Sequence, residues 1–547
     1  MTALAAFFES YYRRRPVNAT FTGVHDYDDC LPDWSPEGLA CAADEMRAQR
    51  AAIRPDGALH DVGARDRALA GSFLNVEIAE HDSGHFYHRN PSLAAGEAIF
   101  SALALMTRPF APVDERAAAA TARLLAMRAF LAGARQTITH AVPDEWRIRA
   151  LRECDGADRL FGTGVRRWCA VEAIPHGRAE RLVSAADRAR AAFAEFRLWL
   201  ERDVRSSPDG YGCGPALFDD LMEHGHWCSR PRAALAEEAR AALDEALARV
   251  DERARHISPG GWPELQQRLA KAHPSADEYL SSYRRAWDAC RARAEALDLV
   301  TWPDYPIRYV PIPPHTRDAA PLLYYLHYRS PAPFDRLPVH EYVVTPIEPE
   351  MSPEEQRQRL RAANTSVIKL NHVVHHGAIG HHVQNFYAYA GPSAIGRVAA
   401  VDCACRIGML QGGTMAEGWA CYATDVMDEV EFLTPEESVA QQHTRARLLA
   451  RAVVDIGLHE GSLAFEDAVA IYRDRIGMTP QTARAEACKN SMFPATAIMY
   501  WLGTEGLHQL RRERQRVEGT AFVLGRFHDR VLSFGSIPVL LLSTVYR

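Results

Sequence analysis

The amino-acid sequence predicts a mainly α-helical protein with a few short strands. Two observations lead to this fold class. Long stretches of the 547-residue chain carry apolar residues at helical spacing, with few helix breakers among them. Short apolar alternations, which are typical of strands, are confined largely to residues 300–350.

Four long helices are predicted before the strand-like segment. The stretch "SPGGWPE" separates the last two, and Pro263 stands where a helix would begin, because proline is favoured in the first turn. The four helices cover roughly residues 112–140, 179–204, 232–256 and 263–297.

The segment that follows Leu297 is rich in proline, tyrosine and valine. Helix resumes at "SPEEQRQRL", where Ser352, Pro353 and Glu355 match an N-terminal cap, and helical patterns then continue toward the C-terminus. Between these points we expect short strands near 306–312, 322–328 and 340–346, joined by proline turns.

The chain is expected to have two helical halves, residues 1–300 and residues 301–547, integrated as one domain over 1–547. The second half contains a cluster of histidines. A chain of this length could fold as several ordinary domains or as one large helical body, and no repeat or low-complexity linker divides it.

Composition excludes several classes of function. The formal net charge of −7 gives no basic surface for nucleic acid, and the arginine-rich stretches also carry acidic residues, as solvated helix faces do. No apolar run approaches the length of a membrane span, and the first residues lack the order of a signal peptide. The eleven cysteines are scattered without a C-x-x-C pair. We therefore expect a cytoplasmic protein without a membrane or nucleic-acid partner; its oligomeric state is not indicated.

The stretch "NHVVHHGAIGHHVQ" is unusual because it holds five of the 23 histidines within eleven residues. Imidazole nitrogen is the commonest protein ligand of zinc and similar divalent metals. Residues seven apart on a helix, such as His375 and His382, are two turns distant and could share an ion only if the helix were broken between them. Gly377 and Gly380 permit such a break.

This cluster predicts a divalent-metal site, zinc or a similar ion, although a histidine can also pack and hydrogen-bond without chemistry. Such a site usually needs a further ligand, often a carboxylate from a second helix. "GGTMAEGWACYATD" offers Glu417 within an otherwise apolar helical stretch. A buried glutamate could instead pair with an arginine, but near a histidine cluster it is the natural third ligand.

Several ordered motifs now point to a known family. The sequence resembles a bacterial family known as domain of unknown function 885, which is similar to zinc metallopeptidases of the gluzincin kind. Its HExxPGHHxQ motif corresponds to "HHGAIGHHVQ", its EGWA motif to "EGWACY" and its VDxGxH motif to "VDIGLH". A late segment corresponds to "EACKNSMFPATAIMYWLG", and both ends of the chain carry similar signatures. The resemblance covers nearly the whole chain and implies a zincin-like helical fold with a deep central groove.

Three residues depart from the family pattern. Ile379 replaces a proline, Lys489 replaces an arginine, and His376 replaces the glutamate that acts as general base in zinc peptidases. His376 could serve as the base, become a further metal ligand, or mark the loss of peptidase activity.

The resemblance assigns roles to the remaining residues. The metal ligands are expected to be His375, Glu417 and one of His381 and His382, with His381 preferred because the glycine of the motif directly precedes it. Tyr500 is the candidate donor to a developing oxyanion, or else a core tyrosine with a bonded hydroxyl group.

Two further groups are expected to support the site. Asp455 and His459 are expected to orient a ligand or to line the substrate groove, together with whichever of His381 and His382 is not a ligand. A purely structural pair of Asp455 and His459 is the alternative.

Three functions follow from these expectations. The first is a metal-dependent hydrolase that cleaves an amide or peptide-like bond of a small-molecule or peptide-like substrate with metal-activated water. The second is a metal-dependent lyase or another non-peptidase enzyme. The third is a catalytically silent binding protein on the same fold.

Overall fold

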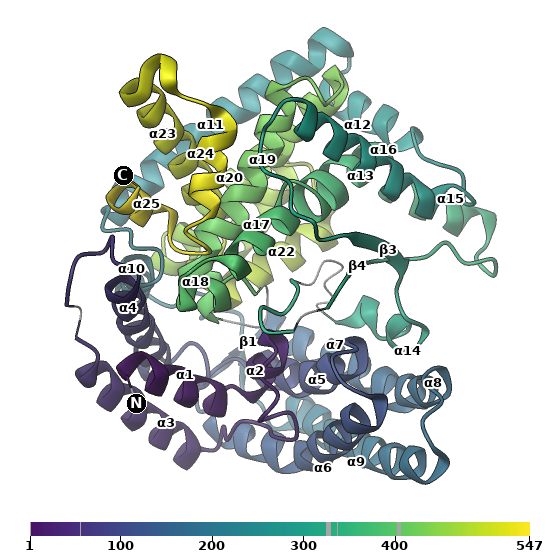
Figure 1. The fold of residues 1–547 in the computed structure, drawn as a ribbon. Coiled ribbons are helices and arrows are strands. Elements are labelled where there is room, and N and C mark those ends of the chain that lie inside the picture. The colour runs from purple at the N-terminus through teal and green to yellow at the C-terminus, as the bar shows by residue number, and fades with distance from the viewer. Residues whose placement is uncertain (1, 55, 324–329, 336, 402–405, 547) are drawn as a thin grey trace.

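The computed structural model confirms a mainly helical protein, with 71% of the residues in helices and 3% in strands. It describes residues 2–54, 56–323, 330–335, 337–401 and 406–546. In Figure 1 the helices up to α9 occupy the lower half of the view and most later helices the upper half, with the β3–β4 pair near the boundary.

The N-terminal part consists of helices joined by short connections. Its helices are α1 Ala3–Arg14, α2 Pro16–Thr22, α3 Pro36–Ala52, α4 Val62–Asp82, α5 Pro91–Thr107, α6 Val113–Thr137, α7 Asp144–Arg159, the π-helix η1 Leu160–Gly164, α8 Val165–Val171, α9 His176–Arg202 and α10 Pro215–His224. Two strands of two residues, β1 Val142–Pro143 and β2 Ser206–Ser207, pair in parallel and were not predicted.

The rest of the chain contains the second strand pair and the site-bearing helices. Its elements are α11 Arg232–Ile257, α12 Gly261–Lys271, α13 Tyr279–Ala296, β3 Ile307–Pro311, α14 Pro314–Arg317, the 3-10 helix η2 Ala320–Leu322, β4 His340–Val344, α15 Pro353–Ala362, α16 Thr365–Val367, the π-helix η3 Ile368–Gly377, α17 His381–Ala390, α18 Ala394–Val398, the π-helix η4 Gly408–Gly412, α19 Gly413–Glu429, α20 Pro435–Glu460, α21 Phe465–Ala470, the π-helix η5 Ile471–Arg475, α22 Pro480–Met492, α23 Met499–Glu518, the 3-10 helix η6 Gly519–Ala521, α24 Leu524–Leu532 and α25 Val539–Val545.

Three of the four predicted long helices are confirmed as α6, α9 and α11, each within a few residues of the expected bounds. The single helix predicted over 263–297 is wrong, because the chain forms α12 and α13 with a break between them. Pro274 lies in that break, and proline lacks the N–H group that a helix interior needs and restricts the residue before it.

Two of the three predicted strands are confirmed as β3 and β4, which pair in parallel with Tyr309 opposite Tyr342. Most of the third, 322–328, lies outside the described residues, and Leu322 ends a short 3-10 helix. The expected N-terminal cap is also confirmed, since Ser352 and Glu355 form a reciprocal capping box at the start of α15.

The main core joins elements from both ends of the sequence. Its buried apolar side chains run from Phe7 to Val545. A second cluster lies mainly among α5, α6, α7 and α9. By length and composition alone, α6 is one helix of the described chain that could cross a membrane, and here it packs against α5 and α9.

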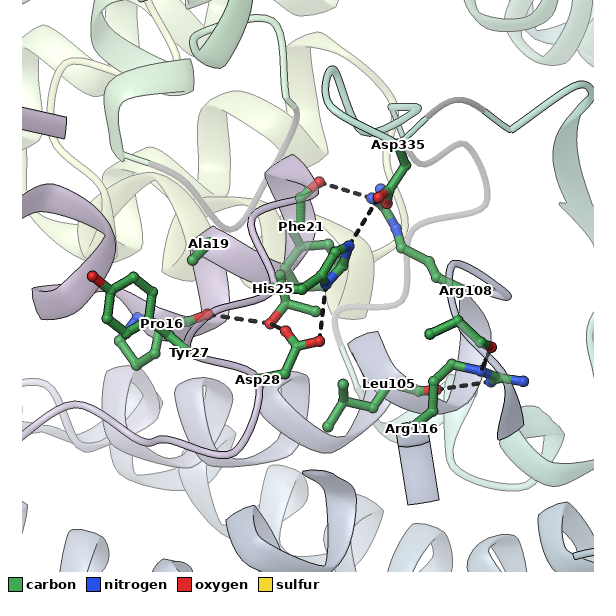
Figure 2. Close-up of polar contacts among 12 residues, drawn as sticks. Pro16, Ala19, Phe21, His25, Tyr27, Asp28, Leu105, Arg108, Arg116 and Asp335 are labelled. Carbon is green, nitrogen blue, oxygen red and sulfur yellow. Dashed lines mark hydrogen bonds and ion pairs between the residues drawn. The ribbon is translucent and has the colours of Figure 1, made fainter. Parts of the chain in front are cut away.

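A partly buried polar clasp holds the N-terminal "TGVHDYDD" stretch against a segment more than 300 residues later (Figure 2). The ring nitrogens of His25 lie 2.9 Å from Oδ2 of Asp28 and 2.8 Å from Oδ1 of Asp335. The His25 ring also stacks on Phe110 with centroids 3.9 Å apart. Although burial opposes it, the two carboxylates raise the pKa of His25 to about 9. The clasp therefore joins a protonated imidazole to two acidic side chains.

Candidate metal centre

The histidine-rich stretch contains a helix break at the expected place. Residues up to Gly377 form the π-helix η3, and a new helix, α17, begins at His381. A Cβ atom on Gly380 would lie 1.9 Å from the carbonyl oxygen of His375, so only glycine fits this close backbone approach. The break therefore brings His381 back toward His375.

Two tryptophans fix the backbone of this break. Nε1 of Trp287, on α13, donates to the carbonyl oxygen of Gly377 over 2.7 Å. Nε1 of Trp419, on α19, donates to the carbonyl oxygen of Ile379 over 2.9 Å. Carbonyl groups left free by the interrupted helix thus find buried donors, as buried backbone groups require.

Two imidazoles converge on one carboxylate oxygen. Nε2 of His375 lies 3.3 Å from Oε2 of Glu417, and Nε2 of His381 lies 3.4 Å from the same oxygen. These side chains come from η3, α17 and α19, and their exposed fractions are 16%, 7% and 14% in the order His375, His381, Glu417. Three separate helices therefore contribute to one nearly enclosed cluster.

His376 joins the same cluster. The ligand-capable atoms of His375, His376 and His381 all lie within 4.8 Å of one another. Nδ1 of His376 lies 2.6 Å from the carbonyl oxygen of Asn371. Because a carbonyl oxygen only accepts, Nδ1 carries the proton and Nε2 presents a lone pair. This tautomer suits either a general base or a metal ligand.

His382 faces another part of the protein. Its Nε2 atom donates to the carbonyl oxygen of Tyr305 over 2.8 Å, and its ring stacks on that of Tyr305 with centroids 5.3 Å apart. Of the neighbouring pair, His381 lies with Glu417 and His382 does not. His372 also lies apart, because its Nδ1 atom bonds the hydroxyl group of Tyr342.

The protonation states suit metal ligation. Burial lowers the pKa of His375 although Glu417 opposes it, and burial with the neighbouring His375 and His381 lowers the pKa of His376. Burial alone would raise the pKa of Glu417, but His381 and His375 outweigh it and hold that pKa well below its usual value. Metal ligands must be neutral imidazoles and ionised carboxylates.

A close contact between α19 and α23 positions Glu417. A Cβ atom on Gly503 would lie 1.9 Å from the carbonyl oxygen of Thr414, and one on Gly418 would lie 2.6 Å from Cα of Gly503. One turn before Gly503, Tyr500 donates a hydrogen bond of 3.0 Å from its hydroxyl group to Oε1 of Glu417. The structure thus places Tyr500 against the carboxylate of the cluster.

Asp455 and His459 anchor backbone segments. The Asp455 carboxylate accepts hydrogen bonds from the backbone N–H groups of Ala495 (3.1 Å) and Ile498 (2.9 Å), just before α23. Nδ1 of His459 accepts from the N–H group of Cys213, and Nε2 donates to the carbonyl oxygen of Asn490, each over 3.1 Å. Asp455 therefore acts on the segment leading into the helix that carries Tyr500, while His459 joins the segment before α10 to α22.

Sequence reasoning missed two arginines on α20. The guanidinium of Arg451 lies 5.0 Å from the ring centroid of Tyr500 and forms an ion pair with Glu486. Arg447 lies one turn earlier. The available signal was the four-residue spacing of Arg447 and Arg451 with Asp455 and His459, which puts all four on one helix face.

The residues present fit a zinc-like ion. Two imidazole nitrogens and one carboxylate oxygen form a common three-residue donor set for zinc. Oε2 of Glu417 is buried and accepts no hydrogen bond within the described part of the chain. A buried anionic oxygen without such a bond is costly unless a cation lies beside it. This oxygen is the one that faces both imidazoles.

The similarities to known proteins cover nearly the whole chain. A family model described as bacterial protein of unknown function (DUF885) matches residues 16–545. No curated protein matches the sequence. Two solved structures have the same fold, each with a TM-score of 0.77. One is a candidate lipoprotein of unknown function from Shewanella oneidensis, at 20% identity over 100% of this chain and 98% of that one. The other is a candidate lipoprotein from Colwellia psychrerythraea, at 16% identity over 100% and 99%.

Proposed function

Because the chain belongs to the DUF885 family of bacterial proteins of unknown function, we propose its activity from the cluster itself: a metal-dependent hydrolase of an amide or peptide-like bond. The proposal includes a zinc-like ion held by His375, His381 and Glu417. It also includes the zincin-like character of the fold and a substrate groove at the cluster, which the resemblance to gluzincin metallopeptidases implies.

One observation carries the proposal. Nε2 of His375 and Nε2 of His381 converge on a single buried oxygen of Glu417, at 3.3 Å and 3.4 Å. A purely structural ion pair would place a charged imidazole on the carboxylate, yet burial lowers the pKa of His375. Imidazoles in the neutral form and an ionised carboxylate make a donor set that a divalent cation completes.

Held by His375, His381 and Glu417, a zinc-like ion would act as a Lewis acid that polarises a carbonyl group and lowers the pKa of water toward about 7. The residues of the chain have separate tasks around it. Nε2 of His376 takes a proton from the attacking water and delivers it to the amide nitrogen as the C–N bond breaks. One water is consumed, and a carboxylate and an amine are released.

Two further residues orient this chemistry. The Tyr500 hydroxyl group holds Oε1 of Glu417, which leaves Oε2 to face the imidazoles. A hydrogen bond of this kind fixes the direction of a ligand carboxylate. Donation from Tyr500 to an oxyanion would require this hydroxyl group to leave Glu417 during the reaction. Asp455 acts at longer range, through the backbone before α23.

The position of His376 supports a second candidate. Because its ligand-capable atom lies within 4.8 Å of those of His375 and His381, His376 can instead be a third imidazole ligand. A site with that extra ligand and no separate base would suit a lyase or another non-peptidase reaction. A catalytically silent binding protein is the remaining possibility.

A substrate screen tests the proposal. Purified protein is supplied with zinc, assayed against a dipeptide and acyl-amide library, and assayed again after removal of the metal with a chelator. We expect cleavage that stops on metal removal and returns with added zinc. Metal binding without cleavage of any amide would favour the lyase or binding alternatives. A cytoplasmic location remains a prediction, and the lipoprotein description belongs to the two similar structures.

A further inference from the structure

Arg447 differs from the other polar residues on its face of α20. Arg451 pairs with Glu486 and lies over the ring of Tyr500, while Asp455 and His459 bond to backbone groups. Within the described residues, Arg447 has neither a hydrogen bond nor an ion pair, and its Nε atom is buried. A partly buried guanidinium without a partner is unfavourable in the free protein.

Arg447 lies close to the metal cluster through its neighbours. It is one helical turn from Arg451, whose guanidinium lies 5.0 Å from the ring centroid of Tyr500, and Tyr500 bonds Glu417 of the cluster. Arg447 also acts on Glu486, together with Arg451 and Lys489, and these cations lower the pKa of Glu486 to about 2 although burial opposes them. Three cations thus act on one carboxylate, and Arg451 forms the ion pair with it.

We propose that Arg447 binds a carboxylate group of the substrate, next to Tyr500 and the metal cluster. The bond that is hydrolysed would then lie close to a free carboxylate end, as in a peptide trimmed from its C-terminus or an N-acyl amino acid. This inference rests on the proposed hydrolase function for the reaction, but the binding site itself needs no metal.

A carboxylate fits this position better than a phosphate does. The planar guanidinium group makes two parallel N–H bonds to the two oxygens of a carboxylate. Arg447 is one unpaired cation, and a carboxylate is a monoanion, whereas a phosphate near neutral pH carries up to two negative charges. Arg451 is already paired with Glu486 and has less to offer a second charge.

Calorimetry on the metal-free protein tests the binding site directly. The probes are N-acetyl-L-alanine and N-acetyl-L-alaninamide, which differ only in the carboxylate, together with inorganic phosphate. The metal is removed so that the carboxylate of the acid cannot bind to the metal instead of to Arg447. We expect the acid to bind about 10-fold or more tightly than the amide, as one bidentate charged pair allows. Arg447→Gln should abolish this difference, and Arg447→Lys should keep part of it.

Arg473→Gln is the matched control, since Arg473 is an exposed arginine paired with its neighbour Asp474. It should keep the full preference for the acid. Equal binding of acid and amide by the parent, a preference that survives in Arg447→Gln, or tighter binding of phosphate would overturn the proposal. If Arg447→Gln does not fold, Arg447→Lys takes its place in the test. An undiminished preference for the acid in Arg447→Lys would then overturn the proposal.

The same samples separate this inference from the proposed function. A protein that binds no zinc but prefers the acid through Arg447 would refute the hydrolase and keep the carboxylate site. A protein that binds zinc and cleaves amides without any preference for the acid would support the hydrolase and refute the carboxylate site.

Discussion

The Tyr500 hydroxyl group donates a hydrogen bond of 3.0 Å to Oε1 of Glu417, across the contact between α19 and α23. This bond turns the other carboxylate oxygen toward His375 and His381. A motif near residue 500 and a motif near residue 417 thus form one unit, although 83 positions separate the two residues.

Tyr500→Phe should therefore weaken metal binding without unfolding the protein. The change removes only the hydroxyl group, and loss of a hydrogen bond to a ligand typically costs about 10-fold or more in metal affinity. Competition with a chromogenic chelator measures it. Tyr387→Phe is the control, because that hydroxyl group bonds Asp529 and the carbonyl of Thr301. Equal zinc affinity in the parent and Tyr500→Phe would refute this role.

Gly503→Ala should destabilise the fold by about 2 kcal/mol or more, as forced overpacking does. The added methyl group would lie 1.9 Å from the carbonyl oxygen of Thr414, so α19 and α23 must separate. The urea midpoint of unfolding and the zinc content should both fall. Gly96→Ala, in α5, is the control, because a Cβ atom there meets nothing within 4 Å. That change should be neutral or stabilising by about 0.5–1 kcal/mol. Similar midpoints for the two variants would contradict the account.

His376→Gln separates the two roles open to this imidazole. As a general base, its loss should lower kcat by about 10²–10⁴-fold while zinc content stays unchanged. As a ligand, its loss should remove zinc and activity together. His376→Glu restores the glutamate of the family pattern and, for a hydrolase, should create or raise peptidase activity. Unchanged turnover with full zinc in His376→Gln would exclude His376 from the mechanism.

The His25 clasp should make stability depend on pH. Its folded-state pKa of about 9 lies above the usual value of 6.5, so its contribution is complete below pH 6.5 and is lost as the pH rises through 9. The side chain is 32% exposed, so the effect should stay well under the about 3 kcal/mol that such a shift gives a buried group. The parent's advantage over His25→Gln in urea midpoint should shrink between about pH 6 and about pH 10. An advantage that grows with pH would show that the clasp does not depend on a protonated His25.

Local patterns were enough to predict much of the fold. Helical periodicity identified α6, α9 and α11, alternation identified β3 and β4, and the pattern at Ser352 identified a capping box. Each of these signals depends only on residues that lie close together in the sequence. The break at Pro274 was overlooked, although its signal was equally local.

The site was harder to predict because it depends on distant contacts. Gly377 and Gly380 indicated a helix break, but the break is fixed by Trp287 and Trp419, which lie 90 and 40 positions from the carbonyl groups that they bond. The choice between His381 and His382 depends on the direction in which α17 begins, which these contacts set. The sequence also does not show that Arg447 lacks a hydrogen-bond partner within the described residues, because this depends on which residues lie near it in the folded chain.

The zinc content of the parent and of three variants of the site tests the central claim most directly. The parent, Glu417→Gln, His381→Ala and His382→Ala are loaded with zinc, dialysed against a weak chelator and analysed by mass spectrometry. We expect about one zinc per chain in the parent and in His382→Ala, and almost none in Glu417→Gln and His381→Ala, because only the latter two lose a ligand. A parent that retains no zinc, or a Glu417→Gln protein that retains as much as the parent, would contradict the metal site.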